Sequence, residues 1–209
     1  MREPKKNLFF YHLFKWSIVS PMLHGYFRGR IYGVENVPQE GPLVVASNHA
    51  SNFDPPIVSN CVCRPVAFMS KEELFKIPIL KQAIELYGAY PVKRSSADRS
   101  AIKAAISSLN EGWAVGIFLQ GTRTLDGKVT EPKLGAAMIA AKAKVPILPV
   151  SLWGTEKILQ KGSSFPHLVP VTVRIGEAID PPSSSKRDEL QSVTEKCAEA
   201  INSLHALGR

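Results

Sequence analysis

The sequence predicts an α/β fold in which a mixed, mostly parallel sheet is flanked by helices. Segments with the spacing of strands alternate with segments of helical period along most of the 209 residues. Residues 146–152 are almost entirely apolar, which is typical of a parallel strand that is buried on both faces. The length fits one domain, which we assign to residues 30–209, preceded by an N-terminal helical segment at 1–29.

The strands are expected where β-branched and apolar residues run together between turn residues. They cover residues 30–37, 43–46, 66–70, 89–92, 113–119, 146–152 and 169–175. The helices are expected where apolar residues recur with the helical period. They cover residues 56–63, 71–75, 78–87, 98–109, 134–143 and 186–207. Asp54 and Pro55 favour the start of the first of these helices, as its cap and its first position.

The N-terminal segment is rich in aromatic and basic residues. Residues 8–19 form an apolar run that we expect to be helical and to end at Pro21. These twelve residues would span about 18 Å, against about 30 Å for the hydrocarbon core of a bilayer, so this helix cannot cross a membrane alone. Tyr11 and Trp16 beside cations favour a helix that lies in the membrane interface. Residues 22–27 could continue it as a hairpin or a bent helix, and a helix packed on the domain is the alternative.

Composition limits the partners and the compartment. The net charge of +8 predicts a polyanionic partner, which could be nucleic acid, an anionic membrane or a phosphorylated substrate. The sequence has no recognised nucleic-acid module or aromatic-interleaved basic strand, so we do not expect nucleic acid. The three cysteines do not make a disulfide framework, and Cys61 and Cys63 have the wrong spacing for a zinc site. Lys15 interrupts the first apolar run, so a cleaved signal peptide is not expected.

Polar side chains follow three of the predicted strands. His49 and Asp54 follow the strand 43–46, with a turn between them. Two cations follow the strand 89–92, and a Gln-Gly-Thr-Arg run follows the strand 113–119. These residues are Lys93, Arg94, Gln120, Gly121, Thr122 and Arg123. If the sheet is mostly parallel, the ends of these strands lie at the same edge. This edge then holds a histidine base with its orienting carboxylate, next to groups that can bind phosphate. Such a site could remove the proton from a hydroxyl of a phosphorylated substrate.

Spacing excludes other kinds of site. The sequence has no Gly-x-Ser-x-Gly elbow, so a serine hydrolase is not expected. Gly121 to Lys128 resembles a Walker loop, but it has one residue too many and Val129 where a hydroxyl is needed. Two other interpretations stay open at this point: His49 as a turn residue that caps backbone, and Lys93 with Arg94 as a solvated strand end.

Four motifs and one further lysine-containing stretch resemble those of the glycerolipid acyltransferases, and specifically of the lysophosphatidic acid acyltransferases. Residues 48–54 have Asn-His and then Asp after four intervening residues, and residues 117–124 are similar to the family's Phe-Pro-Glu-Gly-Thr-Arg-Ser. Residues 71–74, 88–94 and 145–150 are similar to other stretches of the family. The resemblance covers about residues 30–178 and places four motifs in the family's order, which is far more specific than any one motif.

The resemblance implies a reaction and a location. His49 would be the general base and Asp54 its partner, and the free hydroxyl of the acceptor would attack an acyl thioester directly, without an acyl-enzyme. The donor would be acyl-CoA or acyl-ACP, the acceptor lysophosphatidic acid and the product phosphatidic acid, and no metal or bound cofactor is implied. The family is membrane-bound, so we expect a peripheral or monotopic protein on the cytoplasmic side of an anionic membrane, attached through residues 8–27.

The resemblance also implies a phosphate site. Three cations would hold the acceptor phosphate, and two small residues would shape the loop. These residues are Lys71, Arg94 and Arg123, with Gly121 and Thr122. Gln120 stands where the family usually has Glu; it keeps a carbonyl acceptor without the charge, and could hold the glycerol backbone or brace Arg123. The change leaves other acceptors open, such as another lysophospholipid or an acyl-amino lipid, and also a non-catalytic lipid-binding protein of the same fold.

Overall fold

The structure is a computed structural model that describes residues 8–76, 81–82, 84–85, 88–92, 99–159 and 165–209. Within these residues, seven strands form one sheet in the order β1-β7-β6-β2-β5-β3-β4. The strands are β1 (Arg30–Tyr32), β2 (Val44–Ser47), β3 (Val66–Lys71), β4 (Tyr90–Val92), β5 (Ala114–Phe118), β6 (Ile147–Trp153) and β7 (Thr172–Ile175). Neighbouring strands are parallel except β6 and β7, which are antiparallel. The predicted mixed, mostly parallel sheet is confirmed.

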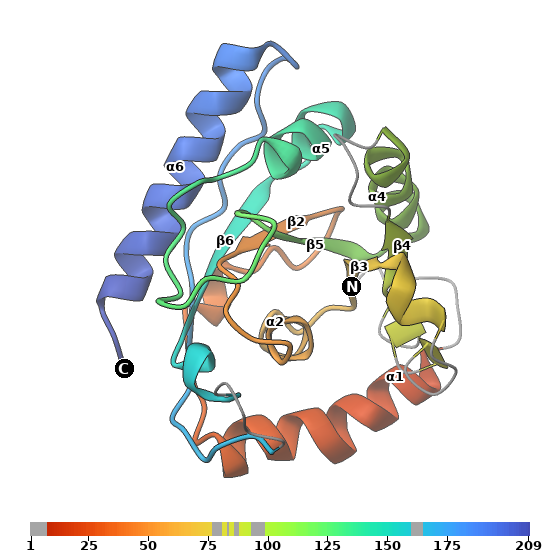
Figure 1. The fold of residues 1–209 in the computed structure, drawn as a ribbon. Helices are drawn as coiled ribbons and strands as arrows, with labels where there is room; N and C mark the ends of the chain where they lie inside the picture. Colours follow the sequence, from red (N-terminus) through yellow and green to blue (C-terminus); the bar gives the residue numbers. More distant parts are fainter. Residues whose placement is uncertain (1–7, 77–80, 83, 86–87, 93–98, 160–164) are drawn as a thin grey trace.

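Helices cover both faces of this sheet (Figure 1). One face carries α4 (Arg99–Glu111), α5 (Gly135–Ala143) and α6 (Arg187–Ala206), and the other carries α2 (Asp54–Cys61) with the N-terminal helix. β2 is buried on both sides: Val45 belongs to the core with α2, and Val44 and Ala46 belong to the core with the three longer helices. Alternate residues of a strand point to opposite faces, so a central strand between two helical layers must be apolar throughout.

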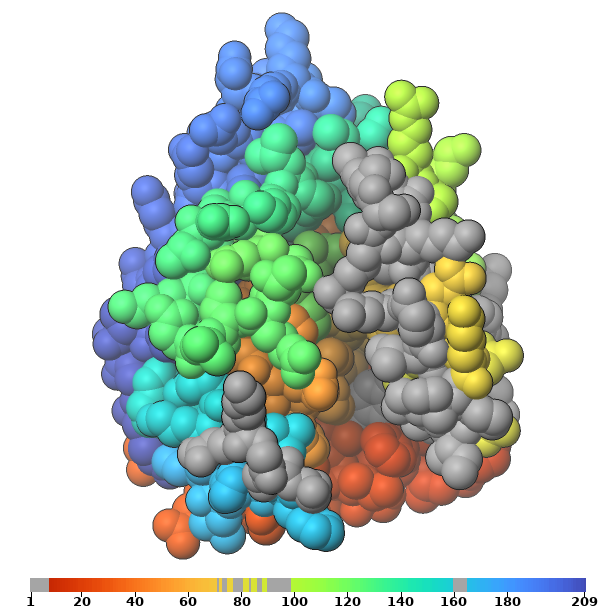
Figure 2. All heavy atoms as spheres, in the orientation of Figure 1, coloured from red at the N-terminus to blue at the C-terminus, as the bar shows by residue number. Residues whose placement is uncertain are grey.

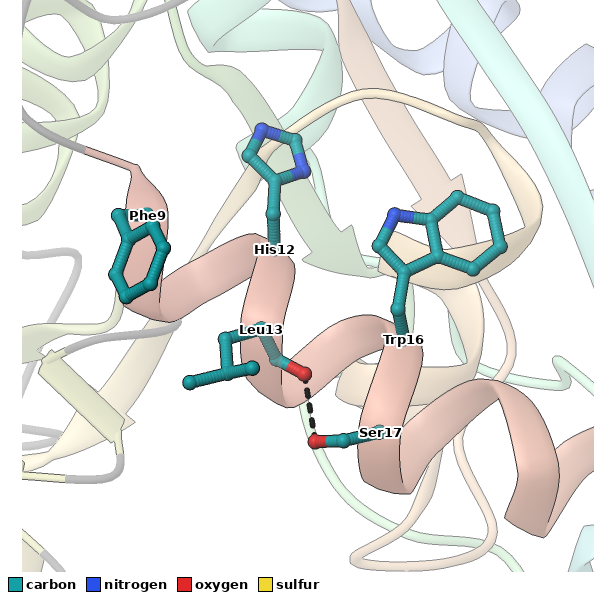
Figure 3. A pocket seen from close by; sticks show the side chains of 5 residues that line it. All are labelled: Phe9, His12, Leu13, Trp16 and Ser17. Atoms are coloured by element: carbon teal, nitrogen blue, oxygen red, sulfur yellow. Dashed lines mark hydrogen bonds between the residues drawn. The ribbon is translucent and has the colours of Figure 1, made fainter.

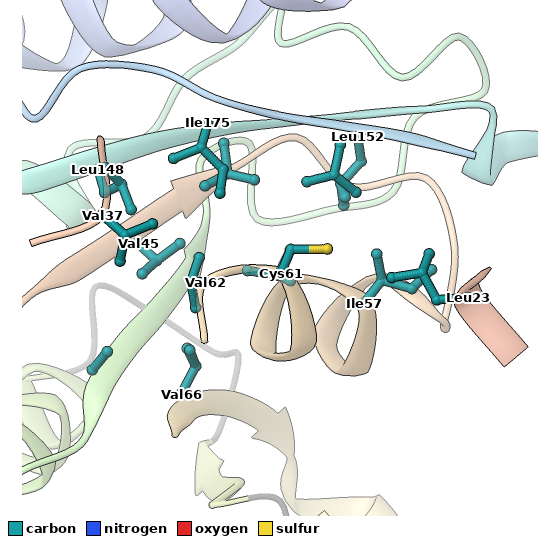
Figure 4. Close-up of a cluster of buried hydrophobic side chains, with 14 of the residues drawn as sticks. Leu23, Val37, Val45, Ile57, Cys61, Val62, Val66, Leu148, Leu152 and Ile175 are labelled. Atoms are coloured by element: carbon teal, nitrogen blue, oxygen red, sulfur yellow. The ribbon is translucent and has the colours of Figure 1, made fainter. Parts of the chain in front are cut away.

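The core between the sheet and α2 also includes the N-terminal helix. Figure 4 shows Ile57 and Cys61 of α2 facing Leu148 and Leu152 of β6, with Leu23 of the N-terminal helix beside Ile57. Leu23 and Ile57 are fully buried. Burial of an aliphatic side chain of this size contributes roughly 1.5–3 kcal/mol, so the N-terminal helix is an integral part of this core.

One continuous helix precedes the sheet and packs on α2. Its parts are α1 (Phe9–Phe14), η1 (Lys15–Val19) and η2 (Met22–Tyr26), of which the last two are wider π turns. The predicted end at Pro21 is wrong, because the helix continues through that residue. A π turn closes immediately before it, where Ser20 N–H donates to Lys15 O. The wider turn accommodates a proline that would clash with an ordinary α-turn.

The inner face of this helix repeats every four residues. Its buried side chains are Tyr11, Lys15, Val19, Leu23 and Phe27. In an α-helix of 3.6 residues per turn such a spacing drifts around the axis, but the π turns contain more residues per turn and keep these positions on one side. The Tyr11 hydroxyl is hydrogen-bonded to Ser59 Oγ of α2 at 2.6 Å. No helix in the described part of the chain is long and apolar enough to cross a bilayer.

Some element boundaries differ from those predicted. β1 ends at Tyr32 because Gly33, with φ of +79°, turns the chain into η3 (Val34–Asn36), and a Cβ at Gly33 would lie 2.0 Å from Ile175 O. β7 begins at Thr172, later than expected. Asp54 is the first residue of α2 and not its cap, because Phe53 occupies the cap position. Much of the predicted helix 78–87 lies outside the described residues.

Candidate active site

His49 and Asp54 form a close pair in the turn between β2 and α2. His49 Nδ1 lies 2.7 Å from Asp54 Oδ2, and the same oxygen accepts the N–H groups of Ala50 and Ser51, each at 2.7 Å. The Asp54 side chain is fully buried, whereas 12% of the His49 side chain is exposed. An ionised carboxylate only accepts hydrogen bonds, so Nδ1 carries the proton and Nε2 is the basic nitrogen. The predicted pair is confirmed as a geometric unit.

The carboxyl ends of β2 and β5 meet beside this pair. Ser47 is paired with Phe118 in the parallel register, and Leu119 N–H donates to Ser47 O at 2.8 Å. The His49 ring is stacked on the Phe118 ring, with the centroids 3.7 Å apart and the planes 9° from parallel. The carboxyl ends of the neighbouring strands β2 and β5 therefore form the expected common edge of the site.

The loop after β5 is fastened to the turn that carries His49. Thr124 N–H donates to His49 O at 2.8 Å, and Arg123 Nη1 donates to Asn52 Oδ1 at 3.2 Å. Gly121, Thr122 and Arg123 are exposed. Figure 2 shows this loop and the turn after β2 side by side on one face of the molecule. An exposed guanidinium, with its several N–H donors, is thus held close to the predicted base.

Gln120 joins the two ends of the loop after β5 by hydrogen bonds to its backbone. Its Oε1 accepts the N–H of Thr130 at 2.9 Å and lies 3.4 Å from the N–H of Glu131. The hypothesis that Gln120 braces Arg123 is wrong, because Arg123 donates to Asn52 and Gln120 bonds the far end of the loop. A carboxylate oxygen would accept the same N–H groups, so this bracing does not need the neutral side chain.

Lys71 and Arg94 are the other two predicted cations of the phosphate site. Lys71 is the last residue of β3 and is paired with Val92 of β4, so its backbone lies at the same edge as the ends of β2 and β5. Arg94, like Lys93, lies outside the described residues. Their contact with the phosphate stays a prediction from the resemblance.

Asn48 is a site residue that sequence reasoning missed. It is buried, and its Nδ2 donates to Gly127 O at 2.6 Å and to Leu152 O at 2.8 Å, while its Oδ1 accepts Leu152 N–H at 2.8 Å. The side chain next to His49 therefore ties the loop after β5 to β6. Its position beside the predicted base was the only available signal, because the partners are remote in sequence.

The final helix α6 also holds this loop. Asn202 Oδ1 accepts Val129 N–H at 3.0 Å, and Asn202 Nδ2 donates to Val129 O at 2.8 Å. His205 is buried beside Gly127, where a Cβ would lie 2.7 Å from His205 Nε2. Nothing in the sequence indicated these contacts, since α6 follows the helical pattern expected of a simple packing element.

The described residues assemble groups that are suited to proton transfer. In the part of the chain that the structure describes, no three His, Cys, Asp or Glu side chains are grouped so as to hold a metal ion. The assembled groups are a histidine with a fixed tautomer, a buried carboxylate behind it, and an exposed arginine on an adjacent loop. They can remove a proton from an alcohol whose substituent is anionic.

Known proteins resemble this chain in both fold and sequence. The solved structure of a 1-acyl-sn-glycerophosphate (LPA) acyltransferase, PlsC, from Thermotoga maritima has a TM-score of 0.70 and 29% identity, and covers 94% of this chain and 84% of that one. A chloroplastic 1-acyl-sn-glycerol-3-phosphate acyltransferase of Brassica napus is 34% identical over 151 residues, or 71% of this chain. The enzyme of that name from Bacillus subtilis is 29% identical over 182 residues, which is 84% of this chain and 87% of the relative.

The extent of these matches differs among the relatives. The chain spans 43% of the length of the Brassica protein and 61% of a Borreliella burgdorferi relative that is 31% identical to it. The family model described as Acyltransferase matches residues 28–153, more than half of the chain. The match includes β2, α2, β5 and the turn and loop that carry His49, Asp54 and Arg123. This chain belongs to the Acyltransferase family.

Proposed function

We propose that this protein transfers a fatty acyl group from an acyl thioester to the free hydroxyl of 1-acyl-sn-glycerol-3-phosphate, which forms phosphatidic acid. The observation that carries the proposal is the His49–Asp54 pair beside the exposed Arg123. A base and a guanidinium on one sheet edge suit an alcohol that is linked to a phosphate. The names of the Brassica, Bacillus and Thermotoga relatives support the same acceptor.

His49 supplies the base in this reaction. Its Nε2 takes the proton of the acceptor hydroxyl while the hydroxyl oxygen bonds to the thioester carbonyl carbon. The C–S bond then breaks, and the imidazolium returns the proton to the leaving thiolate, so the protein is unchanged at the end. Asp54 keeps the proton on Nδ1 and stabilises the positively charged ring during the transfer. The hydroxyl attacks the thioester directly, so no acyl-enzyme forms.

Arg123 binds the acceptor phosphate in this proposal. Asn52 accepts one of the N–H groups of its guanidinium, and the side chain is exposed, so other donors can face a ligand. Lys71 and Arg94 complete the phosphate site, and Gly121 and Thr122 shape the loop. Their support is the family resemblance, together with the position of the β3 end at the same edge.

The acyl donor is a thioester of coenzyme A or of acyl carrier protein, bound as a co-substrate. A thioester is already an activated acyl group, so the proposed step needs neither a metal nor a bound cofactor. The choice between the two carriers is decided by assay with both.

We also propose that the N-terminal helix attaches the protein to the cytoplasmic side of an anionic membrane. The outer face of the helix leaves Phe9, Phe10, Leu13 and Trp16 between 51% and 64% exposed. Figure 3 shows three of them along a shallow groove on this helix, together with His12. Exposed aromatic side chains on a helix suit the membrane interface, and the net charge of +8 suits anionic lipids.

A second exposed apolar segment lies beside the end of this helix. The Tyr26 hydroxyl donates to Pro166 O at 2.8 Å, which joins the segment to the helix. Phe165 is 80% exposed and Leu168 is 55% exposed. The proposed membrane surface therefore includes both the outer face of the helix and these two side chains.

Acyl transfer in detergent or vesicles tests the enzymatic proposal. The substrates are acyl-CoA or acyl-ACP with lysophosphatidic acid, and the variants are His49→Ala and Asp54→Asn. We expect His49→Ala to abolish turnover and Asp54→Asn to lower kcat by roughly 10³–10⁴, because an amide favours the wrong histidine tautomer. The exposed His24→Ala is the control and should retain activity.

A panel of acceptors decides the second candidate, which is transfer to another lysophospholipid or an acyl-amino lipid. Gln120, in place of the family's usual acid, is the observation that favours it. A wild type that ignores lysophosphatidic acid but acylates another acceptor would replace the proposed substrate. Inactivity with every acceptor and both donors would support a non-catalytic lipid-binding protein.

A further inference from the structure

Three aromatic rings are stacked at the base of the candidate active site. The His49 ring lies on Phe118 with the centroids 3.7 Å apart and the planes 9° from parallel. The Phe118 ring lies in turn on Phe68, with the centroids 5.2 Å apart and the planes 24° from parallel. Phe118 ends β5 and Phe68 belongs to the neighbouring β3, so the stack connects the sheet to the turn after β2.

Gly116 makes room for this stack. It is paired with Phe68 in the register of β3 and β5, and a Cβ at Gly116 would lie 2.3 Å from Phe68 Cε1. The Phe68 ring therefore fills the space that any other side chain at position 116 would occupy. Gly116 and Phe118 are two residues apart on one strand and so share a face, which places the Phe68 ring where Phe118 can lie on it.

The stacking geometry gives the protonated form of His49 a favourable contact. Neutral aromatic pairs prefer an offset or edge-to-face arrangement, with centroids about 4.5–7 Å apart. A separation of 3.7 Å between nearly parallel rings places the imidazole of His49 over the face of the phenyl ring. A cation, in contrast, is attracted to the face of an aromatic ring. The arrangement therefore suits the positively charged ring that His49 becomes when it takes a proton.

We propose that Phe118, supported by Phe68, is a positioning residue that holds the plane of the His49 ring and stabilises its protonated form. This inference rests on the proposed acyl transfer, in which His49 is the base. The two constraints on the ring are complementary: Asp54 holds Nδ1 through a bond to the ring edge, and Phe118 opposes tilting of the ring through contact with its face.

Kinetics over a range of pH provide the first test. Phe118→Leu should lower kcat/KM for lysophosphatidic acid by roughly 2- to 30-fold, mostly through kcat, if the ring acts as a cation–π partner. Because the imidazolium loses a stabilising contact, the acidic limb of the pH–rate profile should move to lower pH. Phe118→Tyr and Phe118→Trp keep an aromatic face and should restore both properties. A role in packing alone would lower the rate and leave the limb in place.

Titration of the His49 ring by NMR, in detergent and without substrate, provides the second test. The His49 ring should titrate at lower pH in Phe118→Leu than in the wild type. Phe68→Leu should shift the titration in the same direction by a smaller amount. This second variant replaces the first if Phe118→Leu does not fold. Trp113→Leu removes a buried ring at the opposite end of β5 and should leave the titration unchanged. Identical titrations in the wild type and the folded phenylalanine variants would overturn the inference. Inactivity of the wild type with all substrates would instead overturn the proposed function, because the NMR result does not depend on turnover.

Discussion

Arg123 Nη1 donates a hydrogen bond to Asn52 Oδ1 at 3.2 Å, across 71 positions of sequence. Asn52 lies between His49 and Asp54 in the turn after β2, and Arg123 lies in the loop after β5. The part of the site that we propose accepts a proton and the part that we propose binds the phosphate therefore share a direct contact. This contact sets the distance between the two parts without any contribution from the substrate.

Asn52→Ala should weaken binding of the acceptor more than it slows chemistry. A single hydrogen bond at an exposed site is worth about 1 kcal/mol, so we expect KM for lysophosphatidic acid to rise about fivefold, with little change in kcat. Arg123→Lys should raise KM further, because lysine keeps the charge and loses the fork of donors. Asn36→Ala, which removes a hydrogen bond to Ile175 O, is the matched control and should keep the wild-type KM. A fall in kcat at constant KM would contradict this role of Asn52.

Gly127→Ala should destabilise the protein and Gly25→Ala should not. Gly127 has φ of +69°, and its Cβ would lie 2.7 Å from His205 Nε2, whereas Gly25 lies in the N-terminal helix with open space around it. We expect the free energy of unfolding to fall by about 1–3 kcal/mol in the first variant and to stay equal or rise by up to about 1 kcal/mol in the second. Denaturant unfolding with an unchanged m-value measures both. Equal stabilities for the two variants would be inconsistent with a tightly packed Gly127.

The stability of the protein should depend on pH through His205. Burial is the main effect on His205 and lowers its pKa below the ordinary value of 6.5. Glu156 and Asp126 raise this pKa and Lys128 lowers it, but these effects are smaller than that of burial. As the pH falls below about 6.5 the unfolded chain binds this proton before the folded protein does, so the free energy of unfolding decreases. Thermal unfolding between pH 5 and 7 should show a shallower dependence for His205→Gln than for the wild type. Parallel curves for the two proteins would exclude His205 as the source.

Substitutions on the two faces of the N-terminal helix should have different effects. The double variant Leu13→Ala with Trp16→Ala removes exposed apolar surface and should reduce co-sedimentation with anionic vesicles by about tenfold or more. Leu23→Ala, on the inner face, should lower the free energy of unfolding by about 2–5 kcal/mol while the folded protein keeps its affinity for vesicles. Deleting the segment would mix the two effects, because Leu23 and Phe27 belong to the core. An outer-face variant that still sediments like the wild type would contradict the proposed attachment.

Regular elements were predictable because their signals are local. The apolar run of β6, the helical period of α4 and α6, and the polar residues after β2 and β5 were all visible in the sequence. The pairing of His49 with Asp54 was predictable for the same reason, since both residues lie in one turn. The α/β class and the location of the site at one sheet edge follow from these local patterns together.

The remaining features depend on contacts between distant segments. The bond from Asn48 to Leu152 spans 104 positions, and no property of Asn48 alone specifies it. The end of β1 at Gly33 depends on the proximity of Ile175 O, and the passage of the helix through Pro21 depends on a π turn that propensities do not foresee. The bond from Thr130 N–H to the carbonyl of Gln120 spans 10 positions, and no property of Gln120 alone specifies it.

The loop after β5 is bound at several points along its length: by His49 O at Thr124, by Asn48 at Gly127, by Asn202 at Val129 and by Gln120 at Thr130. Such a loop loses its conformational freedom when the chain folds and not when a ligand arrives. In the proposed reaction the acceptor lipid therefore meets a preorganised site, and little of its binding free energy is needed to order the protein. Discrimination among lipids then depends on how well a headgroup fits a fixed shape, so changes at the anchoring residues should alter acceptor selectivity even where they touch no lipid.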